Sequence, residues 1–269
     1  MKLTVLGKYS PYPPAGGAGP GYWVEAGESG TSGSTGSTDG ILLDCGPGVL
    51  SRFQEHVGPL SKIHTVILSH LHFDHFSDVT VLRCAAAAQE RYKELPHHVR
   101  IYAPDQPEAE FSFLTYKEVT SGNALSPGMS LKVGSLKLTF YQGVHGLPSL
   151  AVRIEGPGGV IAYSGDTRPC DALIEAAKGA DLFLCEASGI EADADYVAPG
   201  HLTARQAGEI AAQAGVRRLL LTHIWPLYDE GRLLQECRDV FPHAEIVQEG
   251  RCYSTMGSPT GRIETGPCF

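Results

Sequence analysis

Short apolar runs recur along the whole chain, and most of them have the length and residue content of buried strands. Helical stretches alternate with them. Strands are expected at residues 3–6, 21–26, 41–44, 65–69, 136–141, 150–154, 160–163, 182–185, 218–222 and 245–247. Helices are expected at residues 49–56, 79–91, 171–178, 203–214 and 231–241. The pattern therefore predicts two β-rich halves, each with flanking helices.

Residues at the ends of these elements support the assignment. Thr203 is typical of a helix N-cap, and Gly215 is typical of a residue that ends a helix. Residues 28–39 are almost entirely Gly, Ser and Thr. We predict a flexible hairpin tip there rather than a domain linker, because strand-like segments flank the stretch closely.

Length, composition and charge restrict the class of protein. A chain of 269 residues can form one large α/β domain or two small ones, and we expect a single domain over residues 1–269. The formal net charge of −9 argues against a large nucleic-acid footprint, which normally shows as a basic face. No apolar run approaches the length of a membrane span, and no signal peptide is visible after Lys2. We therefore expect no membrane partner.

The cysteines predict a reducing compartment. Their number is odd and no C-x-x-C pair occurs: they are Cys45, Cys84, Cys170, Cys185, Cys237, Cys252 and Cys268. A chain of this length does not need disulfides to hold a core, so reduced thiols in a cytoplasmic protein fit better than a disulfide framework. Cys185, in the apolar run 182–185, is expected to behave as a small buried hydrophobe.

Three histidines and an aspartate fall within six residues directly after the apolar run 65–69: His70, His72, Asp74 and His75. Side chains two apart on a strand point to the same side, so His70 and His72 can converge on one centre. If the chain then curls into a loop or a helix start, Asp74 and His75 can turn to a neighbouring centre. Imidazole and carboxylate suit Zn²⁺ or another borderline divalent metal, including manganese and iron. A solvated loop explains one or two of these residues but not the whole set, so the segment predicts two adjacent metal ions.

Three later apolar strands each end in a further potential ligand, namely His145, Asp166 and His223. Ligands collect at strand ends because the sheet fixes them while the loops stay open to substrate. Each of the three alone has a structural alternative, but together they complete the first cluster. One metal can take His70, His72 and His145, the other can take Asp74, His75 and His223, and Asp166 can bridge both. This coordination leaves room for a bridging hydroxide.

The order His70-x-His72-x-Asp74-His75, followed by His145, Asp166 and His223, resembles the metallo-β-lactamase superfamily. The resemblance implies an αββα four-layer sandwich, with two mixed sheets flanked by helices and a dinuclear metal site at one edge of the sheets. Leu42-Leu43-Asp44-Cys45-Gly46 resembles an early segment of that family, in which the aspartate supports the site from behind the ligands. Asp44 is therefore expected in that supporting position.

A closer likeness is to the ribonuclease Z-like phosphodiesterases. It lies in residues 163–169, 185–188, 201–207 and 221–224. In that branch a histidine matching His201, paired with an acid matching Glu186, assists the chemistry. A carboxylate can hold an imidazole in its protonated form, and the imidazolium can donate to a leaving oxygen. The non-catalytic alternatives are that His201 is an exposed residue at a helix start and that Glu186 is an ordinary carboxylate at a strand end.

The chain departs from ribonuclease Z in one respect. Many members of that branch carry a basic, glycine-rich arm for transfer RNA between the positions matching His145 and Asp166. Here residues 146–165 are used up by two expected strands and a turn at residues 156–159, so no room remains for the arm. This puts transfer RNA processing in doubt and leaves the expected phosphodiesterase site intact.

These observations predict a hydrolase with two divalent metal ions, zinc in the first place, that cleaves a small phosphodiester such as a cyclic nucleotide. A hydroxide bridging the metals would attack phosphorus, with Asp74, His201 and Glu186 as the catalytic candidates. Arg168 is expected either to contact the phosphate or to form a structural ion pair. The alternatives are a lactone or thioester hydrolase, a transfer RNA 3′ processing endoribonuclease, and a non-catalytic metal-binding scaffold. A homodimer is possible, although no segment marks an interface.

Overall fold

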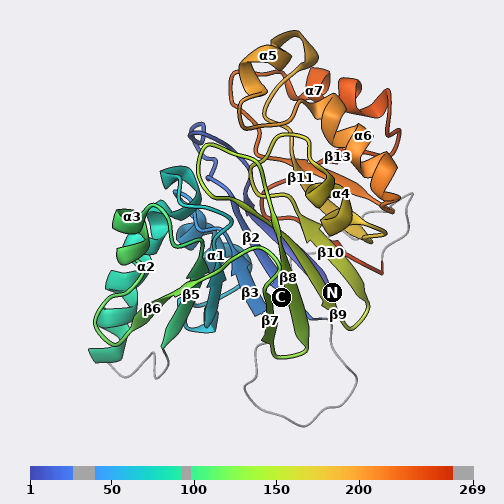
Figure 1. The fold of residues 1–269 in the computed structure, drawn as a ribbon. Helices are drawn as coiled ribbons and strands as arrows, with labels where there is room; N and C mark the ends of the chain where they lie inside the picture. Colours follow the sequence, from blue (N-terminus) through green and yellow to red (C-terminus); the bar gives the residue numbers. More distant parts are fainter. Residues whose placement is uncertain (27–39, 92–97, 257–269) are drawn as a thin grey trace.

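The computed structural model describes residues 1–26, 40–91 and 98–256, which form two seven-stranded sheets packed face to face with helices on both outer sides (Figure 1). The first sheet has the strand order β14-β1-β2-β3-β4-β5-β6. Its strands are β1 (Lys2–Gly7), β2 (Gly21–Glu25), β3 (Gly40–Leu43), β4 (Thr65–Ile67), β5 (Val99–Ala103), β6 (Thr120–Ala124) and β14 (Cys252–Ser254). Together with the second sheet and the helices on both outer sides, this arrangement confirms the predicted four-layer sandwich.

The second sheet has the order β13-β12-β11-β10-β9-β8-β7. Its strands are β7 (Ser130–Val133), β8 (Leu136–Gln142), β9 (Leu150–Gly156), β10 (Gly159–Tyr163), β11 (Leu182–Glu186), β12 (Leu219–Thr222) and β13 (Glu245–Ile246). Strands β10 to β13 run parallel to one another, and β7 to β10 pair antiparallel. Both sheets are therefore mixed.

The helices divide between the two outer faces (Figure 1). On the side of the first sheet lie α1 (Val49–His56), η1 (Leu60–Lys62), α2 (Phe73–Arg91) and α3 (Glu108–Ser112). On the side of the second lie α4 (Asp171–Ala177), η2 (Glu191–Asp193), α5 (Ala194–Val197), α6 (Ala204–Ala214) and α7 (Glu230–Arg238). Thr203 caps α6 with a reciprocal capping box and Gly215 ends it in the left-handed region, as the sequence predicts.

Strand periodicity sorts the apolar side chains into three layers. On β2, Tyr22 and Val24 point into the layer between the sheets, while Trp23 points outward to α1 and α2. On β11, Leu184 points inward and Cys185 points outward to the helices of the second sheet. This alternation follows from the two-residue repeat of a strand. Strands β3 and β12 are almost wholly apolar and fully buried because both of their faces are covered.

The sequence missed several elements. Strands β5, β6, β7 and β14 were not anticipated, and β6 contains Ser, Gly and Asn, which have low strand propensity. Helix α2 begins at Phe73 rather than near residue 79, so Asp74 and His75 lie in its first turn. The expected hairpin tip at residues 28–39 lies outside the described residues, although β2 and β3 pair antiparallel as its flanks require.

The described cysteines carry free thiols, and Cys185 is fully buried as expected. Cys268 lies outside the described residues. Within the described part of the chain, no helix combines the length and apolar character needed to cross a membrane.

The ends of six strands meet at one edge of the sandwich. Strands β3 and β4 are parallel neighbours, so their carboxyl ends share an edge of the first sheet. In the second sheet β8, β10, β11 and β12 run in one direction, so their carboxyl ends share the facing edge. Side chains that follow these strands are therefore brought together from both sheets.

The apolar layer between the sheets should contribute strongly to the stability of the fold. Leu138 on β8 is fully buried there, so Leu138→Ala should lower the free energy of unfolding by about 2–5 kcal/mol. Its neighbour Lys137 points outward with a 61% exposed side chain, so Lys137→Ala should change stability by only about 0.5 kcal/mol. Denaturant unfolding of both variants measures the difference, and equal losses would contradict this layer assignment.

Candidate metal centre

Three imidazoles converge at the shared edge. His70 and His72 lie in the loop between β4 and α2, and His145 lies in the loop after β8. The Nδ1 atom of His72 is 3.0 Å from His70 Nε2 and 3.0 Å from His145 Nε2. The convergence matches the prediction, but its predicted reason is wrong. Strand β4 ends at Ile67, so loop geometry rather than strand alternation brings His70 and His72 together.

A second group lies beside the first. His75 in the first turn of α2 places Nε2 3.1 Å from Nε2 of His223, which follows β12. Asp74 Oδ2 lies 3.5 Å from the same His75 nitrogen and 3.8 Å from the His223 nitrogen. His223 adopts a left-handed backbone (φ 57°), which is uncommon outside glycine and is typical of functional sites.

Asp166, which follows β10, stands between the two groups. Its Oδ2 atom is 3.6 Å from His70 Nε2, 3.4 Å from His75 Nε2 and 3.1 Å from His223 Nε2. Gly165 directly before it has φ 56°, and a Cβ there would meet the Leu150 carbonyl oxygen at 2.7 Å. Only glycine therefore permits the turn that carries Asp166 into the cluster.

The donor set fits two divalent ions. Asp166 Oδ1 is buried and has no hydrogen-bond partner, which is costly for a carboxylate oxygen unless a cation binds it. Zinc–nitrogen bonds of about 2.0–2.1 Å in a tetrahedral shell separate neighbouring nitrogens by roughly 3.3 Å, close to the spacings here. One group that offers converging ligand atoms consists of His70, His72, His145 and Asp166, and another consists of Asp74, His75 and His223; Asp166, His201 and His223 form a third, overlapping group.

The ligand rings are oriented from behind. His75 Nδ1 donates to Asp44 Oδ2 (2.8 Å), and His145 Nδ1 donates to the Gly200 carbonyl (2.8 Å). His223 Nδ1 lies 2.7 Å from Ser188 Oγ, which donates to Glu186. Such contacts fix the tautomer and leave the other ring nitrogen free for a metal.

Asp44 lies behind the metal cluster, where the resemblance implied it. It is fully buried at the end of β3, with φ 52°. Besides the His75 ring, its carboxylate accepts hydrogen bonds from Ser69 N (2.7 Å), Ser69 Oγ (2.9 Å) and Tyr163 OH (2.6 Å). The carboxylate thus ties both sheets and α2 to one point.

The His201–Glu186 pair lies at the edge of the cluster. His201 Nδ1 donates to Glu186 Oε2 (3.2 Å) and lies 3.8 Å from Asp166 Oδ2. Burial lowers the pKa of the His201 imidazole, but the Glu186 carboxylate outweighs this and raises that pKa to about 9. Glu186 is itself fully buried and also accepts from Thr167 N and Leu202 N. The Glu186 carboxylate therefore favours the protonated form of the His201 imidazole.

The cluster is buried on one side and open on the other. His70, His75, Asp166 and His223 are buried, whereas His72 is half-buried and the His201 side chain keeps 21% exposure. Burial and the neighbouring imidazoles lower the pKa of both His70 and His72, which keeps these rings in the neutral form that binds metal. Substrate must therefore approach from the side of His72 and His201.

Arg168 is exposed two residues after Asp166. Its side chain forms no hydrogen bond or ion pair with any described residue, which counts against the structural ion-pair alternative. Its backbone nitrogen donates to Val144 O (3.0 Å) and fixes the loop next to His145.

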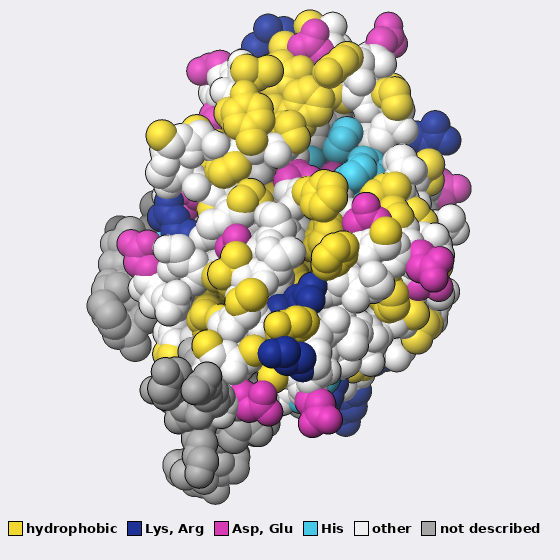
Figure 2. All heavy atoms as spheres, turned by 90° about the vertical axis from the view of Figure 1, so that its left-hand side faces the viewer, with side chains coloured by type: hydrophobic (Ala, Val, Ile, Leu, Met, Phe, Trp, Pro, Cys, Tyr) yellow, Lys and Arg dark blue, Asp and Glu magenta, His cyan; other side chains and the backbone are white. Residues whose placement is uncertain are grey.

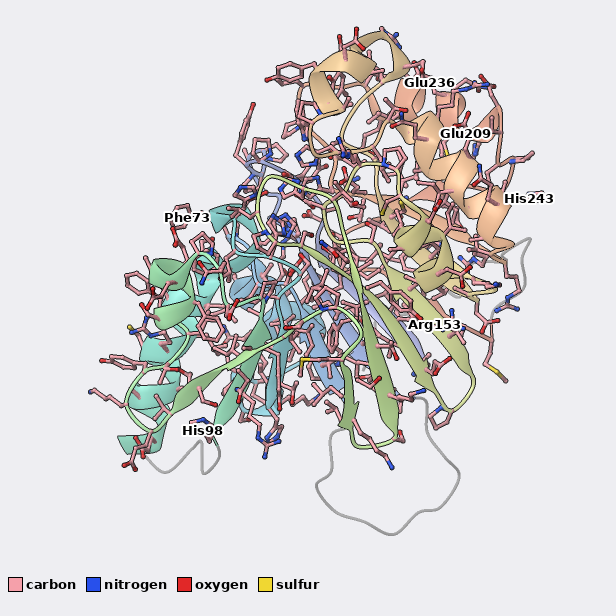
Figure 3. The ribbon with its side chains drawn as sticks, in the orientation of Figure 1. Phe73, His98, Arg153, Glu209, Glu236 and His243 are labelled. Carbon is pink, nitrogen blue, oxygen red and sulfur yellow. The ribbon has the colours of Figure 1, made fainter. Side chains whose placement is uncertain are left out.

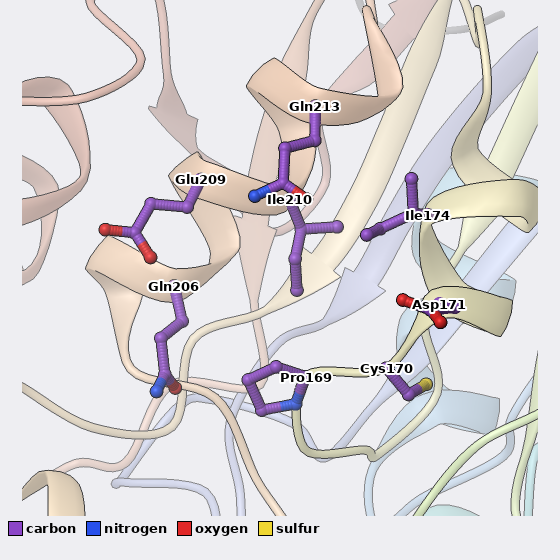
Figure 4. Close-up of a pocket in the computed structure, with 8 residues that line it drawn as sticks. All are labelled: Pro169, Cys170, Asp171, Ile174, Gln206, Glu209, Ile210 and Gln213. Atoms are coloured by element: carbon purple, nitrogen blue, oxygen red, sulfur yellow. The ribbon is translucent and has the colours of Figure 1, made fainter.

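A separate pocket of about 300 Å³ lies between α4 and α6 (Figure 4). Ile174 and Ile210 line it with apolar side chains, and Asp171, Gln206, Glu209 and Gln213 line it with polar ones. None of the clustered histidines or aspartates lines it, so it is distinct from the metal centre.

Sequence reasoning missed the residues behind the ligands. Ser69, Tyr163 and Ser188 all lie in or beside segments with recognisable ligands, but a serine or tyrosine carries no ligand signal of its own. Ser10 was also missed, and its hydroxyl donates to Asp74 Oδ2 (2.7 Å) across 64 residues of chain. Ser69 precedes His70 directly, and Tyr163 and Ser188 lie within the segments that resemble the ribonuclease Z-like branch, whereas Ser10 carries no such signal.

Comparisons with known proteins agree with this architecture. A family model described as "Beta-lactamase superfamily domain" matches residues 40–224. The chain is 34% identical over 241 residues to "Probable metallo-hydrolase YhfI" of Bacillus subtilis, covering 90% of this chain and 94% of that protein. The YhfI crystal structure superposes with a TM-score of 0.85 at 32% identity, covering 94% of this chain and 98% of that one.

Two more distant solved structures share the fold. Human tRNase Z, short form, has a TM-score of 0.71 at 20% identity and covers 95% of this chain and 99% of that one. Zn²⁺-bound PqqB from Methylobacterium extorquens has a TM-score of 0.66 at 16% identity and covers 94% of this chain and 100% of that one.

The Asp44 carboxylate can be tested directly. Asp44→Asn keeps the shape but turns an amide donor toward groups that already donate, so it should cost about 1–3 kcal/mol of stability. It should also weaken metal affinity about 10–100-fold, because His75 loses its partner. Chelator competition and denaturant unfolding measure both effects. The exposed Asp105→Asn is the control, and wild-type metal affinity in Asp44→Asn would contradict the assigned role.

Proposed function

The chain belongs to the beta-lactamase superfamily and carries a His/Asp metal-binding cluster, and from this premise we propose that it is a metal-dependent phosphodiesterase. The proposed substrate is a small phosphodiester such as a cyclic nucleotide. The proposed cofactors are two divalent ions, zinc in the first place, and the zinc-bound state of PqqB supports that choice.

The observation that carries the proposal is the His201–Glu186 pair beside the metal cluster. Cleavage of a phosphodiester expels an alkoxide, which is a poor leaving group unless it receives a proton. His201 Nδ1 is held by Glu186 at 3.2 Å, and no described residue forms a hydrogen bond with its Nε2. That nitrogen is therefore available to donate a proton to a leaving oxygen bound at the cluster.

Two further features support a small substrate. Strands β9 and β10 are joined by the two residues Pro157 and Gly158, so this hairpin provides no arm for a large RNA. The net charge of −9 gives no broad basic surface for a nucleic-acid backbone.

The contacts suggest a separate role in the proposed reaction for each group of residues. Bound divalent ions would lower the pKa of water and stabilise the charge that develops on phosphate oxygens. His70, His72 and His145 would hold one ion, Asp74, His75 and His223 the other, and Asp166 would contact both. Glu186, anchored by two backbone N–H groups, fixes the ring of His201 and compensates its charge. Arg168 is exposed nearby and free to pair with a phosphate oxygen.

A substrate panel tests the reaction class. We expect the metal-loaded protein to hydrolyse bis(p-nitrophenyl) phosphate and a 3′,5′-cyclic nucleotide faster than a lactone or a thioester at equal concentration. Metal analysis of the same sample should give about two equivalents per chain. Turnover of the lactone or thioester without turnover of either phosphodiester would overturn the proposal.

His201→Ala tests the proton donor. The variant should lose about 10²–10⁴-fold in turnover of the 3′,5′-cyclic nucleotide, whose leaving alkoxide needs a proton, while its metal content stays that of the wild type. The matched control is His243→Ala, since His243 is exposed on the far side of the second sheet (Figure 3). Unchanged turnover in His201→Ala would remove His201 from the mechanism, whereas loss of metal would show that it is a ligand.

A further inference from the structure

A connected series of aromatic rings leads outward from the metal centre. Trp225 follows His223 by two residues, and its ring meets the His201 ring edge to face with centroids 6.0 Å apart. Tyr196 of α5 meets the Trp225 ring edge to face as well, with centroids 5.7 Å apart. Tyr228 stacks on Trp225 at 6.0 Å with an interplanar angle of 19°. These three rings, Trp225, Tyr196 and Tyr228, form an aromatic wall. The proposed proton donor, His201, lies at its inner end.

This wall remains open to solvent. Tyr196 is 73% exposed although its ring contacts Trp225, and Leu227, next to Tyr228 in the sequence, is 78% exposed. Figure 2 shows hydrophobic side chains gathered next to the visible histidines of the site. Exposed aromatic surface is unfavourable in water, so a ligand that covers it lowers the free energy of the complex.

The wall is also anchored rather than loose. The Tyr228 hydroxyl donates to Asp193 Oδ2 (2.9 Å), which joins the loop after β12 to the η2–α5 segment. The η2–α5 segment lies between Ser188 and His201 in the chain, and the Gly200 carbonyl that follows it accepts from His145 Nδ1. A binding surface held in place before the ligand arrives loses less entropy on binding.

We propose that Tyr196 and Trp225 bind the nucleobase of the substrate by stacking, so that this wall makes the enzyme prefer nucleotides among small phosphodiesters. The inference rests on the proposed function. If His201 donates to the leaving oxygen, the sugar that carries this oxygen lies against the His201 ring. The next surface outward is Trp225 and then Tyr196. A planar base is the part of a nucleotide that aromatic rings recognise, since every base has a π-face.

The charge of the same segment favours a single nucleotide. Glu191 and Asp195 are exposed near Tyr196 and add negative charge to this side of the site. A longer nucleic acid would bring further phosphates toward these carboxylates and be repelled. An uncharged base experiences no such repulsion.

The test compares ligands with and without a base on the metal-loaded full chain. Calorimetry should show that wild type binds adenosine 5′-monophosphate about 10–100-fold more tightly than ribose 5-phosphate. Tyr196→Ala should remove most of this preference and leave ribose 5-phosphate affinity unchanged, whereas Tyr196→Phe, which keeps the ring, should retain it. Phe113→Ala, an exposed aromatic residue at the end of α3, is the control.

Kinetics separates this inference from the proposed function. Adenosine 3′,5′-cyclic phosphate is compared with the methyl riboside 3′,5′-cyclic phosphate, which has a methoxy group in place of the base. In Tyr196→Ala, KM should rise for the first substrate only, with kcat little changed. Failure of the wild type to hydrolyse either ester would overturn the proposed function alone. Equal affinity for the two monophosphates in the wild type, or an unaltered preference in Tyr196→Ala, would overturn the base-binding wall.

Discussion

The buried carboxylate of Asp44 is the constraint on which the rest of the site depends. It receives hydrogen bonds from the backbone and side chain of Ser69, from Tyr163 and from His75. A buried carboxylate is tolerated only when it is fully paired, so these partners are held as firmly as the carboxylate itself. Because they come from the loop after β4, from β10 and from α2, one charge aligns both sheets with the first turn of the helix that carries Asp74 and His75.

This alignment explains how loops can form a rigid metal centre. Tyr22 OH and Thr222 Oγ1 lie 2.7 Å apart between the sheets, and Leu150 N donates to Ser69 O (3.0 Å). Asp44 and His223 both leave their strands in the left-handed region, a conformation that costs of order 1–3 kcal/mol for such residues. The surrounding hydrogen bonds offset that strain. The two sheets thus act as one frame, and a ligand on one is fixed relative to a ligand on the other.

Part of this fold and of its metal centre could be predicted from the sequence, and part could not. The strands of the central layers and the seven potential ligands are visible because apolar runs and histidine spacing are local signals, as at His70 and His72. Strand β6 was invisible because its Ser-Gly-Asn content is stabilised only by pairing with β5. The contact of Ser10 with Asp74 was equally invisible, because hydrogen bonds across distant segments leave no periodicity. The early start of α2 was missed since its first turn is polar on the side that faces the centre.

The chain segment between β11 and α6 connects the proposed proton-donor pair to the proposed base-binding wall. It begins at Glu186 and ends at His201, so its length and packing set the distance between the two members of the proposed donor pair. The same segment carries Tyr196 on its outer side, against Trp225. Substitutions at its exposed positions can therefore alter what lies against the wall without moving the buried pair. Changes at Ser188 or Gly200 would instead disturb the rings of His223 and His145 directly. Substrate preference can thus diverge in this fold while the metal centre stays the same, because the two depend on opposite sides of one short segment.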